Sequence, residues 1–132
     1  MKYIGRYGEY IVLSSLLKRD VEAYLAIKTN QDDYDITVIN SKNKILRIQV
    51  KTTELNNKST NNSISGTDKK YDFLILVIVS SCNEIYILPK DDVERIKGQS
   101  KQLGTTFQKN GTFEVKEEIK LFKDKWELIE NA

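Results

Sequence analysis

The chain has 132 residues, among them 21 Lys and Arg, 19 Asp and Glu, one cysteine and no histidine. This length suits a single domain, residues 1–132, that buries its core without disulfides or a structural metal. The small positive charge neither requires nor excludes a nucleic-acid partner. The lack of histidine excludes Ser-His-Asp and Cys-His catalysis, zinc sites of the His type and His-based metal nucleases. Carboxylates, lysines and a cation that they hold therefore remain for polar chemistry.

Neither a membrane segment nor a secretory signal is expected. The longest apolar run, Phe73 to Val79, is far shorter than the roughly 20 residues of a membrane helix, and no hydrophobic signal region opens the sequence. The single cysteine, Cys82, cannot form an internal disulfide. We therefore expect a soluble, cytoplasmic protein with no membrane partner.

A first helix is predicted from Tyr7 to Lys18, because apolar residues recur there at helical spacing. They form one stripe that consists of Val12, Leu13, Leu16 and Leu17. Glu9 projects along the same stripe, and a carboxylate that faces inward needs a polar partner. Gly5 and Gly8 either let another backbone or a phosphate approach this helix or only shape its beginning.

A β-hairpin is predicted from the two strands Asp35 to Ile39 and Leu46 to Lys51. The residues between them are polar and suit a three-residue loop. With Asn43 in the left-handed conformation, Asn40 and Lys44 become the last pair of the hairpin. The register of the two strands follows from this loop.

That register brings polar side chains together on one face of the hairpin. Successive side chains of a strand point to opposite faces, so Ile48 and Val50 share one face while Gln49 and Lys51 share the other. Asp35 lies opposite Gln49 and on its face, with Cβ atoms about 5 Å apart. A carboxylate, an amide and an ammonium group are thus expected at one place.

Further strands and a long loop surround this hairpin in the sequence. Val21 to Lys28 is expected to form a strand before it. The polar segment 54–70 follows it and is expected to be a mobile loop, because it offers almost no apolar surface to bury. Tyr71 to Ser80 is a near-continuous apolar run, which is typical of a strand covered on both faces, and Glu84 to Leu88 returns beside it.

The last third of the chain predicts a short helix, a hairpin and a closing helix. Asp91 is the expected N-cap of the short helix, which ends at Gly98. The pair Asn110-Gly111 indicates a tight turn within a hairpin from Thr105 to Lys116. A closing amphipathic helix is expected over 117–130, with an apolar stripe that consists of Ile119, Phe122, Trp126 and Ile129.

The polar residues of the first helix and the first hairpin suit metal-dependent hydrolysis. Glu9, Asp35 and Gln49 offer the oxygen ligands that magnesium prefers, with manganese as a substitute. A magnesium ion held there lowers the pKa of a bound water and neutralises charge on a phosphoryl oxygen. Lys51 then positions or deprotonates the nucleophile or stabilises the transition state. Phosphodiester hydrolysis without histidine requires such groups.

In order and spacing, Glu9, Asp35 and Gln49-x-Lys51 resemble the motifs of the PD-(D/E)xK nuclease superfamily. They are most similar to members with Gln in the third-strand motif, which include group I intron-associated homing endonucleases. Archaeal Holliday junction resolvases are more distantly similar. The resemblance covers about Gly5 to Pro89 and rests on the stretches Tyr34-Asp35-Ile36, Gln49-Val50-Lys51-Thr52, Tyr71-Asp72-Phe73 and Tyr86-Ile87-Leu88-Pro89.

The resemblance implies an α/β fold with a restriction-endonuclease-like core, in which an N-terminal helix precedes a mixed four- to five-stranded sheet flanked by helices. It implies a metal-dependent DNA endonuclease of the homing, restriction or junction-resolving type. Glu9, Asp35 and Gln49 would hold magnesium, and Lys51 would complete the catalytic set. Two departures from the family pattern are Tyr34, where proline is frequent, and Gln49, which replaces an acid and so lowers the expected metal affinity unless Glu9 compensates.

DNA and a second copy of the chain are the expected partners. Lys58, Lys69 and Lys70 of the polar loop are candidates for contacts with DNA phosphates. One site cuts one strand, so a homodimer or homotetramer suits duplex or junction cleavage. Two other classes stay open: a catalytically inactive nuclease-like module that binds DNA, and an interaction protein that uses the edge of the hairpin at 105–116.

Two further acidic positions also stay open. The pair Asp32-Asp33 either adds metal ligands or forms a solvated turn. Asp72 either lies near the site or only caps its strand. The chemistry proposed for the hairpin does not depend on either outcome.

Overall fold

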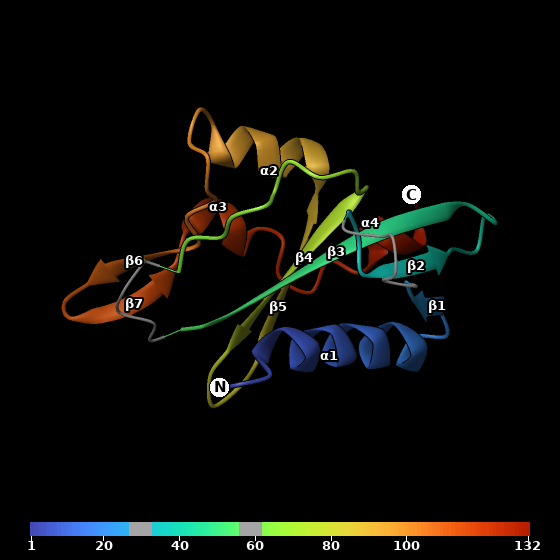
Figure 1. The fold of residues 1–132 in the computed structure, drawn as a ribbon, viewed down its shortest axis with the longest axis horizontal. Helices are drawn as coiled ribbons and strands as arrows, with labels where there is room; N and C mark the ends of the chain where they lie inside the picture. The colour runs from blue at the N-terminus through green and yellow to red at the C-terminus, as the bar shows by residue number, and fades with distance from the viewer. Residues whose placement is uncertain (27–32, 56–61) are drawn as a thin grey trace.

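The computed structural model describes residues 1–26, 33–55 and 62–132 (Figure 1). Its helices and strands, in chain order, are α1 (Ile4–Lys18), β1 (Glu22–Leu25), β2 (Ile36–Ile39), β3 (Ile45–Glu54), β4 (Phe73–Val79), β5 (Glu84–Pro89), α2 (Lys90–Lys97), β6 (Thr106–Lys109), β7 (Thr112–Val115), α3 (Glu117–Lys120) and α4 (Glu127–Glu130). The elements follow the predicted order as far as β7.

Strands β1 to β5 form one sheet in chain order, and β6 and β7 form a separate hairpin. Strand β3 runs parallel to β4, whereas the other neighbours in the sheet are antiparallel. Strand β4 is buried on both faces, as its apolar run predicts. An N-terminal helix followed by a mixed five-stranded sheet with flanking helices confirms the predicted α/β fold.

Helix α1 covers one face of this sheet (Figure 1). Its residues Val12 and Leu16 share a buried hydrophobic cluster with Val50 of β3. The helix approaches β3 closely at Gly8, because a Cβ atom there would overlap the side chain of Thr52. A close approach at Gly8 is thus present, but the approaching group is the side chain of Thr52 and not a backbone or a phosphate, and a Cβ atom at Gly5 would meet nothing within 4 Å.

The opposite face of the sheet is covered by α2, α3 and the segment 62–72 (Figure 1). Leu74 and Leu76 of β4 face this side and share a second buried cluster with Ile64, Val93 and Ile119. Because side chains alternate along a strand, Gln49 and Lys51 of β3 belong to this second face.

The first hairpin has the predicted loop and register. Asn43 adopts the left-handed conformation with a φ of 57°, and the backbone N–H of Asn40 donates to the carbonyl of Lys44 at 3.0 Å. Strands β2 and β3 pair Ile36 with Ile48. Extending this register by one residue places position 35 opposite position 49, as the sequence predicts.

The second hairpin, β6–β7, is also confirmed, with the turn at Asn110 (φ 53°) and Gly111 (φ 82°). It projects from one end of the molecule (Figure 1). Asp91, however, is not the N-cap of α2: the helix begins at Lys90 after Pro89, and no side chain caps it. Pro89 ends β5 and begins the helix at once, which places Asp91 inside the first turn.

The prediction of one closing helix over 117–130 is wrong. The chain forms two short helices, α3 and α4, that are separated at Asp124, which has a φ of 53°. The segment between them pairs with the outer edge of β5, where Ile87 N–H donates to Phe122 O and Asp124 N–H to Ile85 O, each at 2.9 Å. Hydrogen bonds to a sheet edge replace those of a continuous helix.

The interruption also divides the predicted apolar stripe between the two faces of the sheet. Ile119 and Phe122 pack in the cluster beneath α2, whereas Trp126 and Ile129 pack in the cluster beneath α1. A straight helix cannot reach both faces, so the chain must cross the edge of the sheet here. None of the helices in the described ranges has the length and apolar character that crossing a membrane requires.

Candidate functional site

Asp35 and Gln49 lie side by side at the start of β2 and the middle of β3. Gln49 Nε2 donates a hydrogen bond of 2.9 Å to Asp35 Oδ2, and the backbone N–H of Val50 donates one of 2.8 Å to the same oxygen. The Asp35 carboxylate therefore accepts a backbone N–H of β3 that a neighbouring strand would otherwise bond. These two hydrogen bonds fix its orientation.

The amide of Gln49 is nearly buried, with 6% of the residue exposed. Because its Nε2 donates to Asp35, its Oε1 points elsewhere, and this oxygen has no hydrogen-bond partner in the part of the chain that the structure describes. A buried amide oxygen without a partner costs free energy. A cation or a donor from a ligand would satisfy it.

Lys51 lies two residues farther along the same face of β3 and is half-buried. Burial lowers the pKa of its ammonium group, and the charge of Lys69 lowers it further, while Asp35 acts in the opposite direction. The net result is a lowered pKa. Lys51 thus interacts electrostatically with a carboxylate of the site and with a second lysine.

Glu9 approaches β3 from the other face of the sheet. It is 8% exposed and follows Gly8, the residue at which α1 packs closely on Thr52. The inward orientation predicted for this carboxylate is confirmed. The described contacts bring Asp35, Gln49 and Lys51 together, and α1 places Glu9 on the opposite side of the strand that carries two of them.

Asp35 and Gln49 bring a carboxylate and an amide oxygen together, which are the ligand types that a hard cation prefers. Within the described ranges, no group of three or more His, Cys, Asp and Glu side chains is arranged to hold a metal ion. A magnesium site would therefore need the amide oxygen of Gln49 in addition to the carboxylates of Asp35 and Glu9. The buried Gln49 Oε1 next to a carboxylate is the observation that supports such a ligand set.

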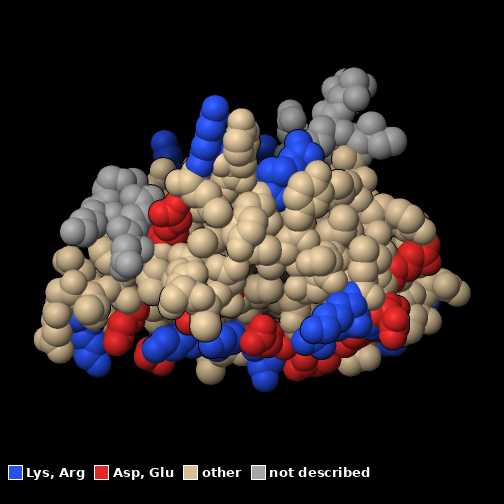
Figure 2. Space-filling view, turned by 90° about the horizontal axis from the view of Figure 1, so that it is seen from below, with Lys and Arg blue, Asp and Glu red and all other residues tan. Residues whose placement is uncertain are grey.

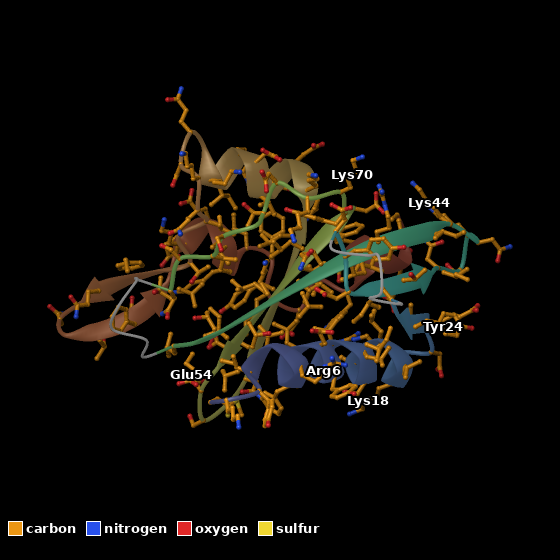
Figure 3. All side chains as sticks on the ribbon, viewed as in Figure 1. Arg6, Lys18, Tyr24, Lys44, Glu54 and Lys70 are labelled. Atoms are coloured by element: carbon orange, nitrogen blue, oxygen red, sulfur yellow. The ribbon has the colours of Figure 1, made fainter. Side chains whose placement is uncertain are left out.

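The predicted DNA-contacting lysines have different positions. Lys69 lies beside Lys51, and Lys70 is exposed, with its backbone N–H donating to Asp33 Oδ1 at 3.2 Å. Figure 3 shows Lys70 on the side of the sheet opposite Arg6 and Lys18 of α1. Lys58 lies outside the described residues, as does Asp32.

The described part of the loop, 62–70, is not the bare polar segment that its composition indicates. Ile64 is buried and forms a β-bridge with Leu103. Asn62 is buried as well, and its side chain makes three hydrogen bonds to Thr53, Leu55 and Thr106. The segment is thus packed on the second face of the sheet, and its behaviour on DNA binding stays a prediction.

Asp72 caps its strand and pairs with a residue that the sequence analysis missed. Its carboxylate accepts a hydrogen bond of 2.7 Å from the backbone N–H of Arg47, and the Arg47 guanidinium lies 3.4 Å away. Arg47 precedes Gln49 by two residues and so lies on the same face of β3. Extending the alternation Gln49-x-Lys51 by two residues toward the N-terminus would have identified Arg47.

The face of the molecule on the α1 side carries charges of both signs. Figure 2 shows Lys and Arg next to Asp and Glu along one border, and a central part with few charged side chains. A phosphate backbone is bound best by a surface of one sign. The α1 face therefore does not offer the surface of one sign that an anionic backbone favours.

Comparison with known proteins shows similarity at the level of structure. Neither protein-family models nor curated protein sequences give a match. Among solved structures, the chain is similar to the bacterial homing endonuclease I-Ssp6803I, with a TM-score of 0.70 and 16% sequence identity over 99% of this chain and 91% of that one. At this identity the similarity shows the fold, which the two chains share along nearly their whole length.

Proposed function

We propose that the chain is a magnesium-dependent DNA endonuclease of the PD-(D/E)xK type. The contact that carries the proposal is the hydrogen bond between Gln49 and Asp35, which leaves a buried amide oxygen next to a fixed carboxylate. The fold shared with a homing endonuclease supports it. The specific activity would be that of a homing, restriction or junction-resolving enzyme.

In this proposal Glu9, Asp35 and Gln49 would hold the ion, which requires the Glu9 carboxylate to reach it from the α1 side of β3, and Lys51 would act on the reacting phosphate. When bound, magnesium would supply an activated water and neutralise phosphoryl charge. Asp35 is oriented by Val50 and Gln49 before any ligand arrives, so little reorganisation is needed. Lys51 would donate to a phosphate oxygen, and the downward shift of its pKa also favours a role in taking a proton from the attacking water.

DNA would lie across the face that carries Lys51, with Lys58, Lys69 and Lys70 contacting its backbone. Each lost phosphate contact reduces the salt dependence of binding by about one unit of slope. A homodimer or homotetramer would place two sites on the two strands of a duplex or junction.

The test is cleavage of supercoiled plasmid, linear duplex and four-way-junction DNA with magnesium, manganese or a chelator. Cleavage with either metal and its loss in the chelator and in Lys51→Met are expected. The Lys51→Met protein, purified in the same way, also controls for contaminating nuclease. Equal cutting by both proteins would contradict the proposal.

A second candidate, an inactive nuclease-like module that binds DNA, is favoured by one observation. Gln49 carries no charge, and its amide already satisfies Asp35, so the pair can persist as a polar contact without metal. Binding of DNA without cleavage under every metal condition would select this candidate.

A further inference from the structure

Gly66 lies where Lys51 and Lys69 meet. Its φ of 69° is in the left-handed region, and a Cβ atom built on it would lie 3.2 Å from Lys51 Nζ and 3.7 Å from Lys69 Cε. Both lysine side chains therefore come within 4 Å of one point beside the backbone of the segment 62–70. Any side chain larger than hydrogen would compete for the place of the Lys51 ammonium.

The backbone that carries Lys69 is fixed by contacts of its own. Tyr71 Oη donates to the carbonyl of Thr67 at 2.7 Å. Lys90 Nζ donates to the carbonyl of Lys69 and lies 4.7 Å from the centre of the Tyr71 ring. The position of Lys69 next to Lys51 thus follows from the contacts of Tyr71 and of Lys90 in α2 with this segment.

We propose that Lys51, Lys69 and Gly66 form a phosphate subsite beside Asp35 and Gln49, in which both ammonium groups bind the same phosphodiester of DNA. Gly66 is the positioning residue of this subsite, because its lack of a side chain leaves room for the Lys51 ammonium group. The inference rests on the proposed function and assigns Lys69 to the phosphate that is cut.

The chemistry of the two side chains supports this assignment. An ammonium group is a compact charge with three donors, and its hydrogen bonds to phosphate oxygens are charge-assisted. Two such groups at one place repel each other, and a phosphate between them reverses the sign of that interaction. The anion would thus be bound by two neighbouring ammonium groups, beside the carboxylate of Asp35.

The chain offers a matched control for the glycine. Gly98, at the end of α2, has a φ of 61°, and a Cβ atom there would meet nothing within 4 Å. Gly66→Ala and Gly98→Ala therefore both place alanine at a positive φ, which strains the backbone at either position. Only Gly66→Ala also crowds Lys51.

The experiment measures single-turnover cleavage of plasmid DNA with magnesium, and duplex binding with calcium in its place, by fluorescence anisotropy across a salt series. We expect Lys69→Ala to slow cleavage about tenfold or more at saturating protein and to reduce the salt slope by about one. Gly66→Ala should slow cleavage, whereas Gly98→Ala and the α1 variant Lys18→Ala should cut at the wild-type rate.

The other outcomes distinguish failure of the phosphate subsite from failure of the proposed endonuclease activity. Wild-type cleavage and an unchanged salt slope in Lys69→Ala, or equal rates for Gly66→Ala and Gly98→Ala, would overturn the subsite and leave the proposed endonuclease intact. A wild-type protein that binds DNA without cutting it would overturn the endonuclease, and the salt slopes of Lys69→Ala and Lys18→Ala would still judge the subsite. A wild-type protein that binds no DNA would overturn both.

Discussion

Asp35 and Gln49 are joined by a hydrogen bond of 2.9 Å across the β2–β3 hairpin, and the same Asp35 oxygen accepts the backbone N–H of Val50. The carboxylate thus has two roles. It is a candidate metal ligand, and it satisfies a backbone donor of a strand whose side chain at Val50 is buried. Substitutions of Asp35 can separate its role as a metal ligand from its role as a hydrogen-bond acceptor.

Asp35→Asn should abolish cleavage and change the melting temperature little. An amide oxygen still accepts from Val50 and Gln49, but it lacks the charge that a metal ligand needs. Asp35→Ala should abolish cleavage and also destabilise the fold by about 1–3 kcal/mol, because two donors lose their acceptor. Cleavage assays with thermal melts test both. A wild-type rate in Asp35→Asn would remove Asp35 from the catalytic set, and the exposed Asp91→Asn is the control.

Lys51→Met should abolish cleavage and increase the free energy of unfolding at neutral pH. The folded protein lowers the pKa of this ammonium below its usual value of 10.5, so the charged form destabilises the fold. That cost is full below the folded pKa and disappears as the pH rises to the unfolded value. The gain from Lys51→Met should therefore shrink between pH 7 and about pH 10.

Urea denaturation of wild type and Lys51→Met at both pH values measures this difference. Lys18→Met, on the exposed end of α1, serves as the control for a lysine at the surface. A loss of stability in Lys51→Met at pH 7 would show that the ammonium makes a net favourable interaction in the fold.

Gln49→Glu should make the stability of the protein depend on divalent cations. The substitution removes the donor to Asp35 and places a second carboxylate beside it, so like charges face each other where a hydrogen bond of 2.9 Å joins the two side chains in the wild type. Without metal, the melting temperature should fall by several degrees. Magnesium or calcium should restore it, because a charged ligand replaces a neutral one.

Thermal melts with chelator and with each cation, together with calorimetric titration of the metal, test this prediction. The wild-type protein should show a smaller thermal shift with metal than Gln49→Glu. Equal shifts in the two proteins would place Gln49 outside the metal site.

Local sequence patterns predicted the hairpin of the site correctly, whereas the closing helix required information from distant residues. The alternation along β3 and the left-handed Asn43 are local features, and they determine the register that brings residue 35 opposite residue 49. The break at Asp124 depends on hydrogen bonds to the edge of β5, and an apolar stripe at helical spacing carries no sign of them.

The same distinction applies within the candidate site. The position of Gln49 and Lys51 on the same face of β3 follows from the two-residue period of a strand. The approach of Gly66 to Lys51 depends on how the segment 62–70 packs over the sheet, and composition indicated only a polar loop. Burial of Asn62 was missed for the same reason, because asparagine is an ordinary loop residue until its partners are known.

Asn62→Ala should destabilise the protein by about 3 kcal/mol, because the side chain of Asn62 joins the end of β3 to the β6–β7 hairpin. It accepts from Thr53 and donates to Leu55 and Thr106, and the side chain of Thr105 donates to its backbone carbonyl. Alanine would leave buried polar groups unsatisfied and would strain a residue with a φ of 54°.

Asn110→Ala separates the two effects, since Asn110 has a φ of 53° and lies at the exposed turn of the same hairpin. It should cost only the strain of the left-handed conformation, about 1 kcal/mol. Chemical denaturation gives both values, and hydrogen exchange should show faster exchange over residues 105–116 in Asn62→Ala alone. Equal destabilisation by the two substitutions would mean that the buried hydrogen bonds of Asn62 contribute no net stability and that the hairpin is held by its apolar contacts.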